Sequence, residues 1–207
     1  MRQQTLLKIV RLMRTELSNG LTILKISKKL KIGYRPAYNH INSMGEEGIV
    51  KIVKVGNAKQ CFLNLGNAKC RHLLEEIDTL EKDEIYNGNQ KIRAVIESLI
   101  SKLTREFISD IHSIVLFGSH AKGTATKASD IDLLFIVTDL KNKKLREGIE
   151  RESASYQYSH NIKVSPLITD INEFNKMLKS EELNVGKETR EHGISLYGSE
   201  MFWRLVT

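Results

Sequence analysis

The stretch from Ile111 to Val137 restricts the fold more than any other part of the chain. It holds two runs rich in β-branched and aromatic residues, IHSIVLF and IDLLFIV, each long enough for one buried strand. The first run ends abruptly at Gly118-Ser119, and the second is preceded by Asp130 and carries Asp132. Between them, HAKG is typical of a first helical turn, and TATKAS is polar. The stretch therefore predicts a strand, a tight turn, a short helix and a second strand.

The turn at the end of the first strand has the residues that a phosphate site requires. Gly118 lets the chain turn sharply and lets a phosphate approach the backbone, because it has no Cβ. Ser119 lies where the helix begins, so its N–H and hydroxyl can both donate to phosphate oxygens. Lys122 can neutralise phosphate charge from the same turn. A Gly-Ser pair after a strand is also common in ordinary turns, so this signal alone is weak.

The second strand offers paired carboxylates. Asp130 and Asp132 are two residues apart, so both side chains project from one face, while Ile131 and Leu133 point into the core. Such oxygen ligands suit Mg²⁺, with Mn²⁺ as a substitute, and two ions ~3.5–4 Å apart would stabilise the attacking and the leaving oxygens. Ser129 could contact a phosphate or a metal-bound water, or it could cap the turn before the strand.

Taken together, these motifs resemble a known family. The segment LFGSHAKGTATKASDIDLLFIV is similar to the DNA polymerase β-type nucleotidyltransferase superfamily, particularly its small prokaryotic members, and the similarity covers roughly residues 90–207. The resemblance implies that Gly118 and Ser119 hold a nucleoside triphosphate, and that Asp130 and Asp132 bind Mg²⁺. It also implies transfer of a nucleoside monophosphate to an acceptor, which could be a protein, an RNA end or a small molecule.

One element of that family is missing. The superfamily normally supplies a third carboxylate from a later strand, and the corresponding segment here is NIKVSPLIT, residues 161–169. Its polar face offers Lys163 and Ser165 in place of an acid, and Pro166 fits only an edge strand or a bulge. Asp170 and Glu173 follow, but either Asp170 or Asn172 is expected to cap a helix, with Glu173 in its first turn. Loss of the acid should impair catalysis more than nucleotide binding.

The N-terminal third has a different charge from the rest. Residues 1–66 contain 12 Lys/Arg and 3 Asp/Glu, a net charge of +9, whereas the whole chain has a net charge of +7. A basic segment of this kind either faces a polyanion or is simply a solvated surface.

The local pattern of this basic segment favours a winged helix-turn-helix. After a first apolar helix, TILKISKKL and residues 34–47 predict two helices, and IVKIVKV and KQCFLNL predict a hairpin with its turn at Gly56-Asn57-Ala58. The stretch from Leu21 to Val50 resembles bacterial and archaeal winged-helix regulators. That resemblance implies that the third helix enters a major groove of double-stranded DNA. The residues expected to contact DNA are Tyr34, Arg35, Tyr38, Asn39 and Asn42 on that helix, and Lys54 and Lys59 beside the wing turn. Winged helices also serve as dimerisation or docking modules.

Residues 67–110 predict amphipathic helices with a break near Asn87-Gly88. The first helix is expected to be a connector and a possible homodimer seam. Its apolar stripe consists of Leu73, Leu74, Ile77 and Leu80.

The expected fold class is therefore α+β: a winged helix (residues 1–66), a helical connector (67–90) and a nucleotidyltransferase domain with a small mixed sheet flanked by helices (91–207). The N-terminus lacks the features of a secretory signal, and the apolar runs are too short to span a bilayer. Cys61 and Cys70 are expected to be reduced thiols in a cytoplasmic protein. The leading functional hypothesis is a Mg²⁺-dependent nucleotidyltransferase; the alternative is a DNA-binding regulator whose second domain only binds or senses nucleotide.

Overall fold

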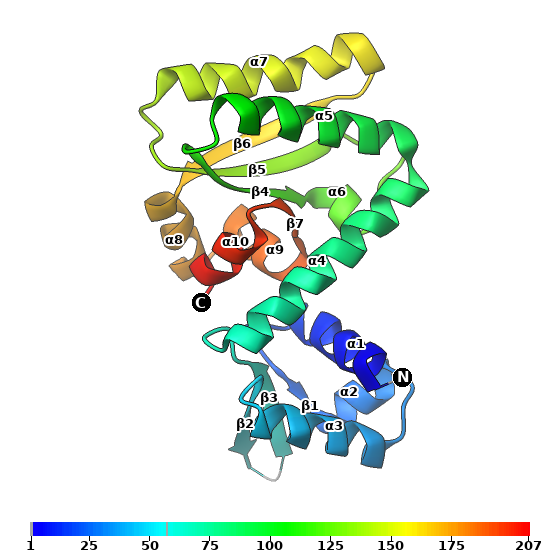
Figure 1. The fold of residues 1–207 in the computed structure, drawn as a ribbon. Helices are drawn as coiled ribbons and strands as arrows, with labels where there is room; N and C mark the ends of the chain where they lie inside the picture. Colours follow the sequence, from blue (N-terminus) through cyan, green and yellow to red (C-terminus); the bar gives the residue numbers. More distant parts are fainter. Residues whose placement is uncertain (1, 57) are drawn as a thin grey trace. The chain divides into compact units, whose positions relative to one another are not determined.

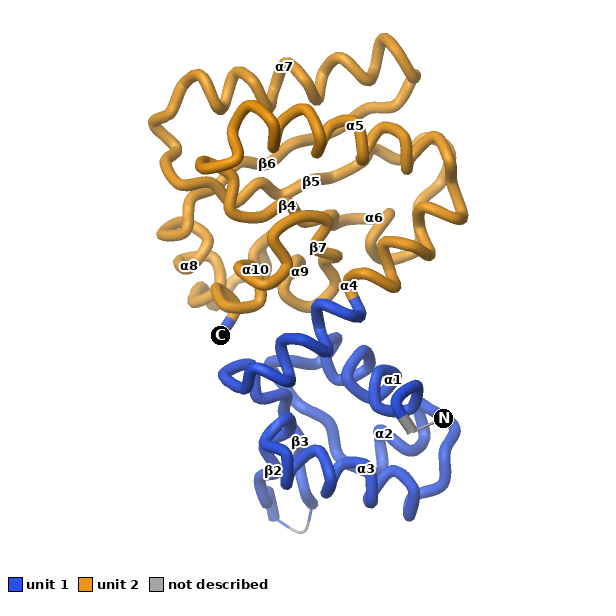
Figure 2. The backbone as a smooth tube through the Cα atoms, viewed as in Figure 1, with its two compact units in different colours: residues 1–77, 207 blue, residues 78–206 orange. Residues whose placement is uncertain are grey.

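The computed structural model describes residues 2–56 and 58–207. It comprises two compact units, residues 1–77 together with Thr207, and residues 78–206 (Figure 2). Both units combine helices with a small sheet, so the expected α+β class is confirmed. The boundary between the units falls inside one helix, within the segment expected to be a connector.

The described residues of the first unit form three helices, the start of a fourth that continues into the second unit, and a three-stranded antiparallel sheet with strand order β1-β3-β2. Its elements are α1 (Arg2–Arg14), β1 (Leu21–Thr22), α2 (Ile23–Lys29), α3 (Tyr34–Glu46), β2 (Val50–Val55) and β3 (Ala58–Leu63). The expected hairpin is present. Its turn includes Asn57, which lies outside the described residues. The short strand β1, which pairs with β3, has no counterpart among the sequence predictions.

Local sequence explains where these helices begin and end. The hydroxyl of Thr22 accepts a hydrogen bond from the backbone N–H of Lys25 and caps α2. Helix α3 ends before Gly48, which adopts a φ of +71°. The residues spaced to form the apolar face of α3 are all buried, as predicted: Ala37, Ile41 and Met44.

The second unit begins within α4 (Ala68–Gly88) and contains a four-stranded mixed sheet with order β6-β5-β4-β7. Strands β5 and β6 are parallel, whereas β4 is antiparallel to both β5 and β7. The remaining elements are α5 (Gln90–Glu106), β4 (Ile111–Phe117), α6 (Gly118–Ala121), β5 (Ile131–Val137), α7 (Lys143–His160), β6 (Val164–Asp170), α8 (Ile171–Lys179), α9 (Val185–His192), β7 (Ile194–Tyr197) and α10 (Ser199–Leu205).

Helices cover both faces of this sheet. Figure 1 shows α5 and α7 on one face and α8, α9 and α10 on the other. Ile131, Leu133 and Phe135 of β5 join the core formed with α5 and α7. Leu134 and Ile136 are also fully buried, because alternate residues of a strand point to opposite faces. The apolar run of β5 therefore fills both layers of the core, and only its beginning carries polar side chains.

The apolar stripe expected on α4 is wrong at one position. Ile77 is buried, but Leu80 is 46% exposed, whereas the polar residues Asp78 and Glu81 in this part of the helix are buried. One carboxylate oxygen of Asp78 accepts hydrogen bonds from the Ser199 hydroxyl (2.6 Å) and the Trp203 indole N–H (2.7 Å). A buried charge that is hydrogen-bonded in this way is tolerated in a core. Which side chains of α4 are buried thus depends on partners that are distant in the sequence.

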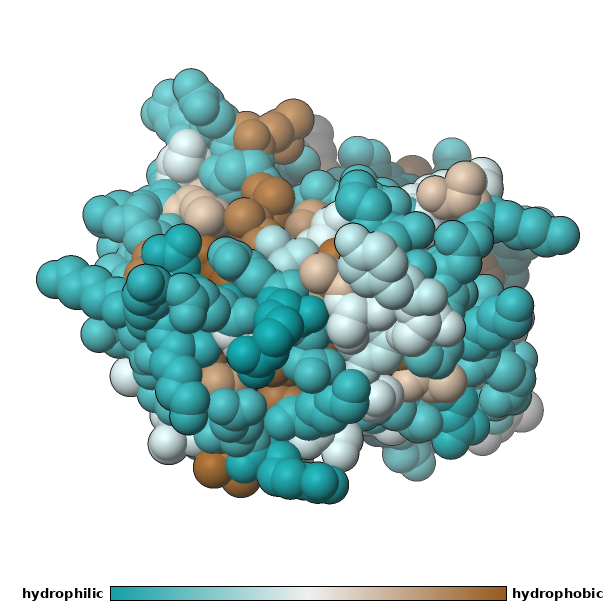
Figure 3. Space-filling model, turned by 90° about the horizontal axis from the view of Figure 1, so that it is seen from above, coloured by the Kyte–Doolittle hydropathy of each residue, from teal (hydrophilic) through white to brown (hydrophobic). Residues whose placement is uncertain are grey.

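The surface seen in Figure 3 is mostly hydrophilic, with small scattered hydrophobic patches. Across residues 2–56 and 58–207, no helix combines the length and the apolar character needed to cross a bilayer. Cys61 and Cys70 are both buried, free thiols.

Candidate active site

Gly118 lies at the junction of β4 and α6 and faces Asp132. Its φ of +68° is in the left-handed region that favours glycine. Its neighbour Phe117 is paired with Asp132 in the β4–β5 ladder. A Cβ on Gly118 would overlap a carboxylate oxygen of Asp132. The turn and the acidic strand are therefore packed so closely that a side chain at position 118 would have to displace the Asp132 carboxylate.

The other residues predicted to bind phosphate lie just beyond this turn. Ser119 is half-buried in α6, and its carbonyl accepts a hydrogen bond from the N–H of Thr124 (2.9 Å). Lys122 caps the C-terminus of α6, and its ammonium lies 2.7 Å from a carboxylate oxygen of Glu188 on α9. Glu188 is not among the site residues predicted from sequence. It is brought here by folding, and no local signal marks it.

Asp130 is held from the side of β6. One of its oxygens, Oδ2, accepts hydrogen bonds from the Lys163 ammonium (2.5 Å) and the Ser165 hydroxyl (3.2 Å). The bond from Lys163 is the largest effect and lowers the pKa of Asp130; burial opposes it, and the bond from Ser165 and the charge of Lys163 lower the pKa further. These partners therefore favour the ionised form of Asp130.

Asp132 lies in a different electrostatic environment. Burial raises the pKa of Asp132, and the charges of Asp130 and Glu188 raise it further, while His120 and Lys163 act in the opposite direction. The negative charge of Asp132 is thus less well compensated than that of Asp130. A divalent cation beside Asp132 would compensate this negative charge.

The donor set around the two aspartates fits one hard divalent cation. Two carboxylates on neighbouring positions, completed by substrate phosphates and water, are the ligands that Mg²⁺ prefers. A second ion fits less well, because Lys163 and Ser165, rather than a third acid, lie against Asp130 on this side of the site. Within the described parts of the chain, no three His, Cys, Asp or Glu side chains are arranged to hold a metal.

The spacer between the two motifs is closed by its own hydrogen bonds. The Ser129 hydroxyl accepts a bond from the N–H of Thr126 (2.9 Å), and the Ser129 N–H donates to the carbonyl of Thr126 (3.1 Å). Ser129 thus closes the turn before β5, one of its two anticipated roles. Asp170 accepts a bond from the N–H of Glu173 (2.8 Å) and caps α8, as predicted.

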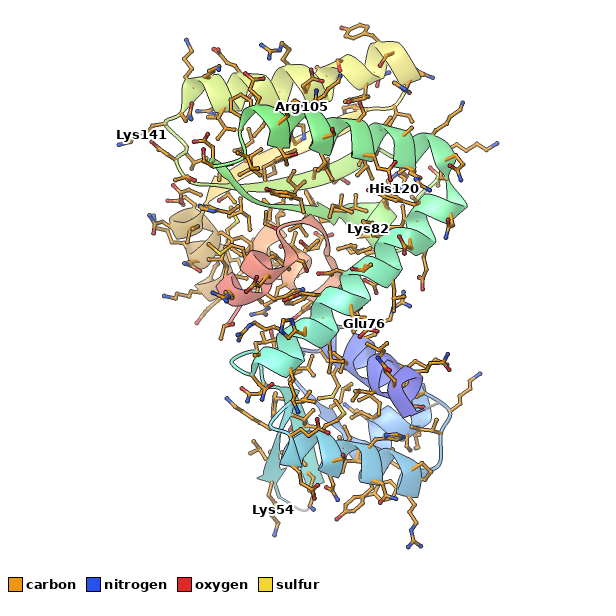
Figure 4. All side chains as sticks on the ribbon, viewed as in Figure 1. Lys54, Glu76, Lys82, Arg105, His120 and Lys141 are labelled. Carbon is orange, nitrogen blue, oxygen red and sulfur yellow. The ribbon has the colours of Figure 1, made fainter. Side chains whose placement is uncertain are left out.

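A cavity of about 740 Å³ opens beside Asp130. Its size falls within the range of small-molecule sites. His120, labelled in Figure 4, contributes to its wall, and its Nε2 is buried without a hydrogen-bond partner among the described residues. Basic and amide side chains dominate the rest of the lining: Asn89, Lys91, Lys127, Gln157, His160, Asn161 and Lys163.

In the first unit, several residues predicted to contact DNA form one cluster. The rings of Tyr34 and Tyr38 are stacked with centroids 6.3 Å apart, and the Lys59 ammonium lies 5.3 Å from the centre of the Tyr38 ring. Lys54 is paired with Lys59 across the hairpin and lies near its tip (Figure 4). Two aromatic rings and two lysines are therefore gathered between α3 and the hairpin.

The other predicted residues surround this cluster. A hydrogen bond with Asn42, followed by the charge of Lys59, lowers the pKa of Tyr38. Arg35 and Asn39 are exposed on α3. The cluster borders a groove of about 570 Å³ that also includes Leu24.

Parts of this chain are similar in sequence to known proteins. Residues 92–184 match the model of the nucleotidyltransferase domain family. "Putative protein adenylyltransferase MJ1305" of Methanocaldococcus jannaschii is 33% identical over 78 residues, which are 37% of this chain and 53% of that protein. "Putative protein adenylyltransferase MJ0141" of the same organism is 27% identical over 105 residues, 47% of this chain and 98% of that protein. The chain thus spans about half the length of the first relative and nearly all of the second.

A solved structure described as "Crystal structure of the toxin-antitoxin with AMP-PNP" is 22% identical, with a TM-score of 0.36, over 53% of this chain and 82% of that one. The family match spans α5 to the loop before α9, and so it includes Gly118, Asp130 and Asp132. The part of the second unit that holds Gly118, Asp130 and Asp132 is therefore similar to the nucleotidyltransferase domain family.

Proposed function

We propose that the second unit transfers a nucleoside monophosphate from a Mg²⁺-bound nucleoside triphosphate to an acceptor hydroxyl. The observation that carries the proposal is the packing of Gly118 against Asp132, with Asp130 two residues away. This arrangement supports the proposal because the turn that would bind phosphate lies beside the two carboxylates that would bind Mg²⁺. The match of residues 92–184 to the nucleotidyltransferase domain supports it independently.

In this reaction the acceptor oxygen forms a bond to the α-phosphorus, and the bond from that phosphorus to the oxygen of the β-phosphate breaks. Pyrophosphate leaves, and the acceptor proton passes to water. The backbone and hydroxyl of Ser119 donate to phosphate oxygens, while Asp130 and Asp132 would hold the Mg²⁺. When bound, the ion supplies positive charge to the triphosphate. The cavity beside Asp130 has room and amide groups for the rest of the nucleotide.

The names of the two relatives support a narrower version. Both are described as protein adenylyltransferases, so we infer that ATP is the donor and that the acceptor is a protein side chain. The matching region includes only part of the first relative. The acceptor is therefore best found by direct labelling.

The test is Mg²⁺-dependent transfer of label from α-labelled ATP to protein or nucleic acid from the source cell. We expect labelling with wild type and loss of more than about 90% of it in Asp130→Ala and Asp132→Ala. Asp139→Ala is the control, because Asp139 is an exposed carboxylate in the loop after β5. Equal labelling by wild type and both site variants would refute the proposed nucleotidyltransferase activity.

A second function is supported by the first unit. We infer that residues 1–66 form a winged helix that binds double-stranded DNA through α3 and the β2–β3 hairpin. The net charge of +9 and the Tyr34–Tyr38–Lys59 cluster favour this function. The order of helices and strands in this unit is compatible with it. In such a protein the second unit could act as an enzyme or as a nucleotide sensor.

A further inference from the structure

Lys163 lies against the acidic pair in a position fixed by the backbone. Its ammonium is 2.5 Å from Oδ2 of Asp130, and its charge also acts on Asp132. The carbonyl of Lys163 accepts a hydrogen bond (2.9 Å) from the N–H of Ile131, the residue between the two aspartates. The start of β6 is thus tied to the start of β5, which brings the lysine stem to the carboxylates.

Ser165 completes this side of the site. It is paired with Asp132 in the parallel β5–β6 register, and its hydroxyl donates to the same oxygen of Asp130 as Lys163 does. Both contacts fall on Oδ2. Among the described residues, Oδ1 of Asp130 accepts no hydrogen bond, so it is available to a further ligand.

The charge balance distinguishes this site from one that binds two metal ions. Two carboxylates carry two negative charges, and one adjacent ammonium reduces the local charge to one. That remaining charge, together with a triphosphate, is enough to attract one divalent ion. A second divalent ion would have to displace the Lys163 ammonium from Asp130 or lie close to it, and like charges at such distances repel strongly.

We propose that the Lys163 ammonium takes the place of the second divalent cation, so that the site binds one metal ion with its nucleotide. This inference rests on the proposed nucleotidyltransferase function. Lys163 is a positioning residue in this scheme: it neutralises and orients Asp130, and it leaves the acceptor proton to water.

The proposal is tested by Mn²⁺ titration followed by electron paramagnetic resonance, first without nucleotide. We expect Lys163→Met, which keeps the alkyl stem but removes the charge, to bind Mn²⁺ at least about ten-fold more tightly than wild type. Lys163→Arg should bind Mn²⁺ as wild type does. Lys176→Ala is the matched control, because Lys176 forms an ion pair with Glu173 on α8 rather than with either aspartate. Equal affinity of wild type and Lys163→Met would overturn the proposal.

The second stage adds a non-hydrolysable ATP analogue and counts the ions. We expect one Mn²⁺ per wild-type chain and two per chain in Lys163→Asp, which restores a third acid beside the pair. Two ions of similar affinity in wild type would overturn the proposal without any variant. If the analogue does not bind, the proposed nucleotidyltransferase function is wrong. The comparison of Mn²⁺ affinity between wild type and Lys163→Met without nucleotide still decides the role of Lys163.

Discussion

Gly118 packs against Asp132 across the β4–β5 ladder, and a Cβ at position 118 would overlap the Asp132 carboxylate. The two residues are 14 positions apart in the sequence. Their packing means that a change in the turn proposed to bind phosphate also disturbs the carboxylate proposed to bind metal.

Gly118→Ala should reduce label transfer by more than the backbone strain of an alanine at this position alone would explain. Gly118 and Gly123 both have a φ of +68°, so alanine costs about 1–2 kcal/mol of stability at either position. No described atom lies within 4 Å of a Cβ built on Gly123, whereas the one on Gly118 overlaps Asp132. We expect label transfer to fall at least ten-fold in Gly118→Ala and to persist in Gly123→Ala. Equal losses would show that the contact with Asp132 is unimportant.

Asp132→Asn should stabilise the fold while it weakens metal binding. The pKa of Asp132 is raised, so the folded protein disfavours its charged form; its contribution to stability is greatest at acid pH and falls as pH rises through that raised pKa. A neutral amide removes this cost at neutral pH. Asp130→Asn should instead destabilise the fold at neutral pH, because the pKa of Asp130 is lowered by its partners, and it should also weaken metal binding. Thermal denaturation at pH 7 and Mn²⁺ titration of both variants measure the two effects.

Asp78→Ala should destabilise the second unit by about 3 kcal/mol, because it leaves the Ser199 hydroxyl and the Trp203 indole in a buried site without this acceptor. Trp203 is the only tryptophan in the sequence, so its fluorescence in a urea titration reports on this unit. Asp83→Ala, an exposed change on the same helix, is the control. A loss of stability no greater than that of the control would mean that these hydrogen bonds contribute little.

Binding to double-stranded DNA should fall steeply as salt increases, with a slope near −0.9 per phosphate neutralised. Arg35→Ala on α3 should weaken binding several-fold and reduce the slope by about one phosphate, since the side chain is exposed and basic. Arg93→Ala in the second unit, where Arg93 pairs with Glu97, should have no effect. Fluorescence anisotropy with a labelled duplex between about 50 and 200 mM salt provides the measurement. If no complex forms at low salt, the first unit is a docking module.

The two cysteines should be inert until the first unit unfolds. Burial raises the pKa of both Cys61 and Cys70 to about 11, so neither forms the reactive thiolate near neutral pH. This effect favours the folded state below the ordinary thiol pKa and is lost as pH rises towards 11. Dithionitrobenzoate at about pH 8 should therefore react slowly with native protein and rapidly in denaturant. Fast reaction with native protein would contradict the burial of these thiols.

Much of the secondary structure follows from local sequence. The runs that form β4 and β5 are apolar enough to predict strands, and the spacing of Ala37, Ile41 and Met44 predicts the buried face of α3. The polar face of residues 161–169 also identifies Lys163 and Ser165 as the side chains in place of an acid. In each case the signal lies within one element, so it can be interpreted without knowledge of the fold.

Features that depend on residues distant in the sequence could not be predicted from one element alone. Glu188 reaches Lys122 only because α9 packs against β4. Asp78 is buried in place of Leu80 because Ser199 and Trp203, more than a hundred residues later, supply donors to it. Strand β7 comes from near the C-terminus and pairs with β4, and its four residues carry too weak a pattern to predict a strand.

Pro166 has a consequence for self-association. It lies in β6, at one edge of the four-stranded sheet, and it lacks the N–H that a continuous ladder requires. The opposite edge is β7, only four residues long. Exposed edges recruit strands from other molecules, and a proline or a very short strand prevents this recruitment. The sheet that presents the two aspartates is therefore protected at both edges against edge-to-edge aggregation.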